Sequence, residues 1–109
     1  MDGSRLPNAA LHILVGLGDE TMHGYGIMLA IEEMTAGQVQ MAPGTLYTTI
    51  KKLLAAGMIE EVEAGVGEPD ERRRYYRSTG QGRAFASTEL RRLDHLVARG
   101  RRAGFLVDR

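Results

Sequence analysis

The segment that most constrains the fold is residues 8–17, whose apolar side chains would cover most of the circumference of a helix. These apolar residues are Leu11, Ile13, Leu14, Val15 and Leu17. Pro7 stands just before the segment, in what would be the first helical turn, where a missing N–H costs nothing. Such a helix must be buried on more than one side, and a chain of 109 residues has little with which to cover the second side. The segment therefore indicates one folded unit that pairs with a second copy of itself.

Two further segments precede residue 43. Ile27, Ile31 and Met34 recur at helical spacing after a turn at residues 21–26, which predicts a second helix that ends at residues 35–37. Polar and apolar residues then alternate at 38–41, which predicts a short edge strand.

Residues 43–56 predict a third helix with two distinct faces. Pro43 suits its first turn, and Gly57 suits its end. The stripe expected to face the core consists of Leu46, Ile50, Leu53 and Leu54. The opposite face carries Thr45, Thr48, Lys51 and Lys52. Helix surfaces often carry lysine for solubility alone, so this face is either a binding surface or a solvated one.

The remaining chain predicts a hairpin and a long last helix. Residues 58–64 and 72–78 have the composition and alternation of two antiparallel strands. Thr79 is the expected N-cap of a helix that reaches about residue 99. No later element covers the apolar stripe of this helix, so the stripe packs on the first helix, on its own copy, or on both. We expect dimer contacts from Leu11, Leu14, Leu90, Leu93, Leu96 and Val97.

This order of elements is that of a winged helix-turn-helix, a mainly α fold with a small β-hairpin. We predict a winged helix-turn-helix DNA-binding domain at 1–78, and a C-terminal dimerisation helix and tail at 79–109. A third helix with a short polar face can enter the major groove of DNA, which is roughly 12 Å wide, while the hairpin tip reaches phosphates alongside.

Composition narrows the function. Without cysteine the chain has no disulfide, thiolate zinc site or cysteine redox chemistry, and its three histidines lack metal-ligand spacing. No catalytic motif is recognisable, and we expect a cytoplasmic protein that is not an enzyme, with no cofactor, metal or membrane partner. The formal net charge of +0 hides a polarised distribution, because acidic residues dominate at 60–71 and arginines dominate from residue 72 onward.

Three short motifs resemble those of PadR-type regulators. They are Met22-His23-Gly24-Tyr25, Pro43-Gly44-Thr45-Leu46-Tyr47 and Arg73-Arg74-Tyr75-Tyr76-Arg77, the last followed by Thr79 and Gly82. The resemblance covers the chain from about residue 11 to residue 82, and the short length is similar to the subgroup with a single C-terminal helix. It implies a homodimeric transcriptional regulator, usually a repressor, with double-stranded operator DNA as partner and a small-molecule effector of unknown identity.

The sequence also departs from the family pattern. Thr48 stands where family members often have proline, so operator preference does not transfer. Ser78 stands where an apolar residue is common, which predicts looser packing of the wing strand. The chain has no tryptophan, whereas some short members stack flat drugs on one in the last helix. Leu93 lies near the position that this tryptophan has in the last helix of those members.

The candidate DNA contacts are Thr45, Tyr47, Thr48, Lys51, Lys52, Arg73, Arg74, Tyr25 and His23. Two of these residues, at the start of the predicted second helix, have a second possible role. His23 could cap the helix, and Tyr25 could simply pack. Tyr47 either packs only, or packs and reaches a phosphate with its hydroxyl. The wing arginines either contact phosphate or are neutralised by the acidic residues at 68–71. A neutral, acidic wing would favour the alternative, a winged-helix module that docks on protein without binding DNA.

Overall fold

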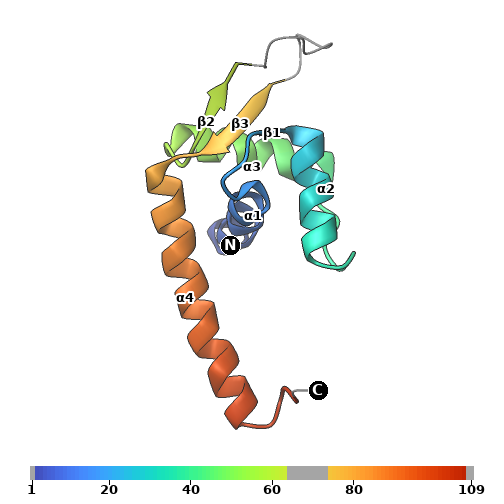
Figure 1. Ribbon diagram of the computed structural model, residues 1–109, viewed down its shortest axis with the longest axis vertical. Helices are drawn as coiled ribbons and strands as arrows, with labels where there is room; N and C mark the ends of the chain where they lie inside the picture. Colours follow the sequence, from blue (N-terminus) through green and yellow to red (C-terminus); the bar gives the residue numbers. More distant parts are fainter. Residues whose placement is uncertain (1, 64–73, 108–109) are drawn as a thin grey trace.

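Four helices and a three-stranded antiparallel sheet make up residues 2–63 and 74–107, the part of the chain that the computed structural model describes (Figure 1). The elements are α1 (Asp2–Leu17), β1 (Met22–His23), α2 (Gly24–Met34), α3 (Pro43–Ala55), β2 (Ile59–Val62), β3 (Tyr75–Ser78) and α4 (Gly80–Arg102). The predicted fold class, a winged helix-turn-helix followed by a long helix, is confirmed. Arg73 and the acidic residues 68–71 lie outside the described residues. The division of the chain at residue 78 stays a prediction.

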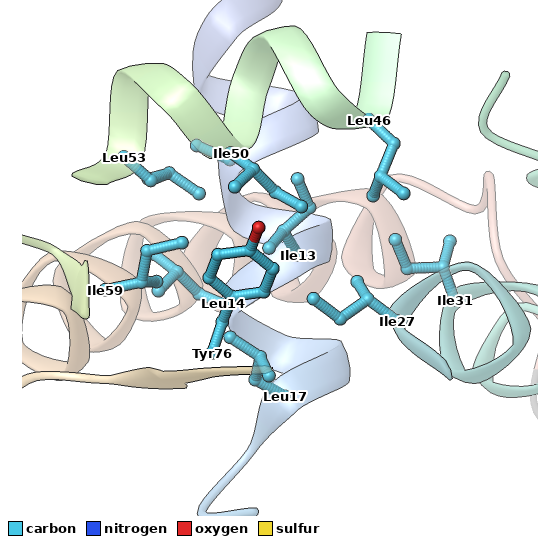
Figure 2. Packing of buried hydrophobic residues seen from close by; sticks show 11 residues of the cluster. Ile13, Leu14, Leu17, Ile27, Ile31, Leu46, Ile50, Leu53, Ile59 and Tyr76 are labelled. Carbon is cyan, nitrogen blue, oxygen red and sulfur yellow. The ribbon is translucent and has the colours of Figure 1, made fainter. Parts of the chain in front are cut away.

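The core forms where α1, α2 and α3 meet beneath the sheet (Figure 2). Its largest fully buried side chains are Ile13, Leu17, Ile27, Ile31, Leu46 and Ile50. The predicted core stripe of α3 is confirmed, since Leu53 is buried with Leu46 and Ile50, and Leu54 is partly buried. Each such side chain stabilises the fold by roughly 1.5–3 kcal/mol through the apolar area that it removes from water.

The chain covers α1 more completely than the sequence suggested. Leu11 and Leu14 are only 7% and 4% exposed, because α2 and α3 pack on one side of α1 while α4 and β3 pack on others. Leu11 and Leu14 therefore have little surface left for a second copy, whereas Val15 is 38% exposed, and pairing of this helix with a second copy stays a prediction. The helix also begins at Asp2 rather than at residue 8, so Pro7 lies inside the helix instead of in its first turn. One proline removes one hydrogen bond there without ending the helix.

The sheet differs from the predicted hairpin by one strand. Its order is β1-β3-β2, with β1 pairing Met22 to Tyr76 and His23 to Tyr75. A strand of two residues has no periodicity, so nothing in the sequence indicated it. The predicted hairpin of β2 and β3 is confirmed.

The strand predicted at residues 38–41 is absent from the described part of the chain. A loop stands there instead, since Ala36 and Gly37 have left-handed φ angles of 53° and 80°. The hydroxyl of Thr35 then accepts a hydrogen bond of 3.0 Å from the backbone of Val39. Val39 and Met41 pack against the core from this loop, which produces the alternation that resembled a strand.

The start of α4 is fixed to the body of the protein by its cap. Thr79 is the N-cap, as predicted: its hydroxyl accepts from the backbone N–H of Gly82 at 3.1 Å and donates to the carbonyl of Gly57 at 2.6 Å. The hydroxyl of Ser78 donates to the carbonyl of Gly18 at 3.2 Å and ties β3 to the end of α1, while the looser packing of the wing strand stays a prediction. The Arg83 guanidinium donates to the same carbonyl at 3.1 Å.

Beyond this anchor, α4 extends away from the other helices (Figure 1). The radius of gyration is 15.5 Å, against about 13 Å for a compact domain of this length. The longest dimension is 52 Å, about twice either of the others. None of the helices in the described part has the length and apolar character that a membrane crossing requires.

Candidate nucleic-acid interface

The exposed face of α3 carries every polar residue that the sequence assigned to it. Thr45, Thr48, Lys51 and Lys52 are all exposed. No ion pair within 4.0 Å joins either lysine to an acidic residue of residues 2–63 or 74–107. The next threonine, Thr49, is buried and donates its hydroxyl to the Thr45 carbonyl at 2.7 Å, so it stays out of the exposed face. Among the residues that the structure describes, this helix face therefore carries two positive charges without an acidic partner.

Tyr47 joins this face to the start of α2. A Cβ atom placed on Gly24 would lie 2.7 Å from Cζ of Tyr47, closer than real Cβ contacts allow. The absence of a side chain at Gly24 therefore lets the Tyr47 ring lie against the first turn of α2, while 48% of the residue stays exposed. Two of the three sequence motifs meet at this contact. Both roles considered for Tyr47 remain compatible with the geometry, because the residue packs and is also accessible.

His23 acts as the cap of α2, which was one of its two expected roles. Its Nδ1 accepts a hydrogen bond of 3.0 Å from the backbone N–H of Gly26. Its ring also meets the ring of Tyr75 edge-on, with the centroids 5.4 Å apart, and so holds β1 against β3. The neighbouring Tyr25 is 57% exposed.

The described wing arginines, Arg74 and Arg77, are paired with glutamates across the hairpin. Arg74 donates to both carboxylate oxygens of Glu61, at 3.0 and 3.2 Å, and Arg77 donates to Glu60 at 2.6 Å. Neutralisation by the acidic residues at 68–71 was one of the two alternatives for the wing, and those residues lie outside the described part. The described partners come from the opposite strand, because the register sets Glu60 directly across from Arg77 and Glu61 across from Tyr76.

Tyr76 connects the wing to α3. It is 5% exposed, and its hydroxyl points toward Ile50 on α3 (Figure 2). Burial raises the pKa of Tyr76 above its ordinary value of 10.0, the negative charge of Glu61 raises it further, and Arg74 lowers it. The register sets Glu61 directly across from Tyr76, so the Glu61–Arg74 pair lies on the same face of the hairpin as the Tyr76 side chain.

Along α4, the apolar stripe is largely uncovered within the described part. Leu90, Leu96 and Val97 are 45%, 63% and 37% exposed, and Leu93 is half-buried. Among the described residues, no three His, Cys, Asp or Glu side chains are placed to hold a metal ion.

A cavity of about 400 Å³ lies between the end of α1, the end of β3 and the start of α4. Its lining is mostly apolar, with a few polar groups. The residues are Leu14, Val15, Gly18, Asp19, Ser78, Arg83, Ala86 and Leu90.

Known proteins resemble this chain in sequence and in fold. Residues 13–88 match the model of the transcriptional regulator PadR-like family. The transcriptional regulator Rv3488 of Mycobacterium tuberculosis is 34% identical over 87 residues, which are 80% of this chain and 77% of that protein. A transcriptional regulator from Clostridium thermocellum has a TM-score of 0.73 at 24% identity, over 89% of each chain. Bacillus subtilis PadR, solved in complex with operator DNA, has a TM-score of 0.64 at 23% identity, over 74% of this chain and 45% of that one.

The family match spans more than half of the chain and includes all three motifs that carry the resemblance. On these matches, the chain belongs to the PadR-like family of transcriptional regulators.

Proposed function

We propose that this protein binds operator DNA as a homodimer, with α3 in the major groove and the wing on the phosphate backbone, and that it acts as a ligand-responsive repressor. The observation that carries the proposal is the exposed face of α3, where Lys51 and Lys52 have no acidic partner in the described part of the chain. A helix face with free cations and hydroxyls suits phosphates and base edges. The shared fold with Bacillus subtilis PadR, which was solved on operator DNA, supports this assignment.

The site residues have different roles in this proposal. Thr45, Thr48 and the two lysines supply contacts from α3, and Tyr47 supplies its hydroxyl from the flank of the same helix. Tyr25 offers a second hydroxyl at the start of α2. Arg73 and Arg74 contribute from the wing. His23 positions the start of α2 through its cap and does not itself need to reach DNA.

Dimerisation is assigned to α4. Its stripe of Leu90, Leu93, Leu96 and Val97 exposes apolar surface along a helix that extends beyond the other helices. Burying such side chains against a second copy removes apolar area from water, and isologous pairing is the commonest route. Leu11 and Leu14 are buried and contribute to the dimer only indirectly, because they support the residues that form its surface.

An effector would bind in the cavity between α1 and α4. The cavity has a volume of about 400 Å³, within the range of small-molecule sites, and it adjoins both the anchor of α4 and the proposed dimer stripe. A ligand there would change the angle of α4 and so the spacing of the two α3 helices. A regulator of this kind acts on DNA in the cytoplasm.

The proposal is tested by fluorescence anisotropy with a labelled fragment of the upstream region of the protein's own gene, and an unrelated fragment, over a range of salt. Each lost phosphate contact should reduce the slope of log affinity against log salt by about 0.9. In a homodimer, Lys51→Ala with Lys52→Ala removes up to four phosphate contacts and should therefore flatten the slope by up to about 3.6. The matched control, Arg99→Ala with Arg102→Ala, removes the same charge from the far end of α4 and should leave the slope unchanged.

A different result would favour the second candidate, a winged-helix module that docks on protein. The observation behind this alternative is the pairing of Arg74 and Arg77 with glutamates, together with a net charge of +0. If neither fragment is bound at low salt, DNA binding is wrong and the wing and α4 become candidate docking surfaces. If DNA is bound but the lysine variant keeps the wild-type slope, α3 is not the contact face.

A further inference from the structure

The two ion pairs of the wing lie on opposite faces of the hairpin. Successive side chains of a strand point to opposite faces, so Glu61 shares a face with Ile59, which is buried in the core. Glu60 points the other way with its cross-strand partner Arg77. The Glu61–Arg74 pair is therefore on the side of the sheet that packs against α3, and the Glu60–Arg77 pair is on the side that faces away.

The Glu61–Arg74 pair shares this face with Tyr76, which stands directly across from Glu61 and whose hydroxyl points toward α3 (Figure 2). Helix α3 carries the proposed DNA-contacting face. Arg74 is thus the described wing arginine on the α3 side of the sheet, whereas Arg77 is directed to the opposite side.

We propose that Glu61 limits DNA affinity by competing with backbone phosphate for the Arg74 guanidinium. This inference rests on the proposed DNA-binding function. A single nitrogen of Arg74, Nη1, contacts both oxygens of the Glu61 carboxylate. A bidentate contact of the guanidinium with phosphate that uses Nη1 therefore requires that Arg74 leave Glu61.

The exchange is feasible because the pair is open to water. The Arg74 and Glu61 side chains are 69% and 42% exposed, and ion pairs of this kind are weak. Competition for Arg74 weakens binding to any DNA sequence, because a phosphate contact carries no base information.

The test compares Glu61→Gln with Glu60→Gln, which removes the same charge from the adjacent residue on the opposite face. Anisotropy is measured on the upstream and unrelated fragments over a range of salt. We expect Glu61→Gln to bind both fragments about two- to fivefold more tightly than Glu60→Gln. It should also steepen the salt slope by about 1.8, the value for one additional phosphate contact from each protomer of the dimer. In an Arg74→Ala background, Glu61→Gln and Glu60→Gln should become equal.

The outcomes separate the two proposals. If the wild type binds DNA and Glu61→Gln equals Glu60→Gln with Arg74 present, the competition by Glu61 is wrong and the DNA-binding function stands. A difference that persists in the Arg74→Ala background also overturns it, because the effect would then not pass through Arg74. If no variant binds either fragment at low salt, both proposals fail. Circular dichroism checks that the exposed substitutions leave the fold unchanged.

Discussion

Replacement of Gly82 by alanine should detach α4 from the rest of the protein. Gly82 is buried in the first turn of α4, where that turn packs on the backbone before β2. A Cβ atom there would overlap the carbonyl oxygen of Met58 and lie 2.9 Å from its carbonyl carbon. The obstacle is backbone rather than a flexible side chain, so α4 must move instead of its neighbour.

The cost follows from what that movement breaks. The Thr79 hydroxyl bonds the Gly57 carbonyl at 2.6 Å, and the Gln81 amide bonds the Ala56 carbonyl at 3.1 Å. Overpacking costs about 1–3 kcal/mol, and loss of the two hydrogen bonds adds about 1–3 kcal/mol. The better helix propensity of alanine offsets about 1 kcal/mol. We expect Gly82→Ala to lower the free energy of unfolding by about 3 kcal/mol.

Urea unfolding followed by circular dichroism measures this change. The protein concentration must be held constant, because the stability of a dimer depends on it. Gly80→Ala is the matched control in the same turn, since a Cβ at Gly80 meets nothing within 4 Å. It should unfold within about 1 kcal/mol of the wild type. Equal unfolding midpoints for the two variants would refute the steric argument and the anchoring role of this turn.

Two further predictions concern the dimer and the flank of α3. Leu93→Asp should yield monomers or aggregates in sedimentation velocity, whereas His95→Asp, about 200° away around the helix, should remain dimeric; a stable, fully dimeric Leu93→Asp would remove α4 from the interface. Gly24→Ala should displace the Tyr47 ring and weaken operator binding about two- to tenfold, the equivalent of one hydrogen bond. Gly26→Ala is its control, because a Cβ there makes only ordinary contacts, at 3.5 Å or more. Additive losses in Gly24→Ala combined with Tyr47→Ala would show that the two residues act separately.

Much of the fold was readable from local patterns. The stripe of Leu46, Ile50 and Leu53 identified α3 and its buried face, because helical periodicity repeats over a few residues. The cap at Thr79 was readable for the same reason, since a cap involves only the first turn of its helix. The three motifs indicated the family, and the match of residues 13–88 to the family model confirms it.

The tertiary structure decided the contacts that depend on packing and register. Nothing in the sequence paired Arg74 with Glu61, thirteen residues earlier, because their meeting depends on the alignment of β2 with β3. The burial of Leu14 within its own chain likewise required the position of α4, which the backbone contact at Gly82 sets. The sequence by itself thus determined the presence of the four helices and the β2–β3 hairpin, the buried face of α3 and the family. Only the folded chain determined which charges are paired and which apolar surface remains uncovered, since both depend on residues far apart in the chain.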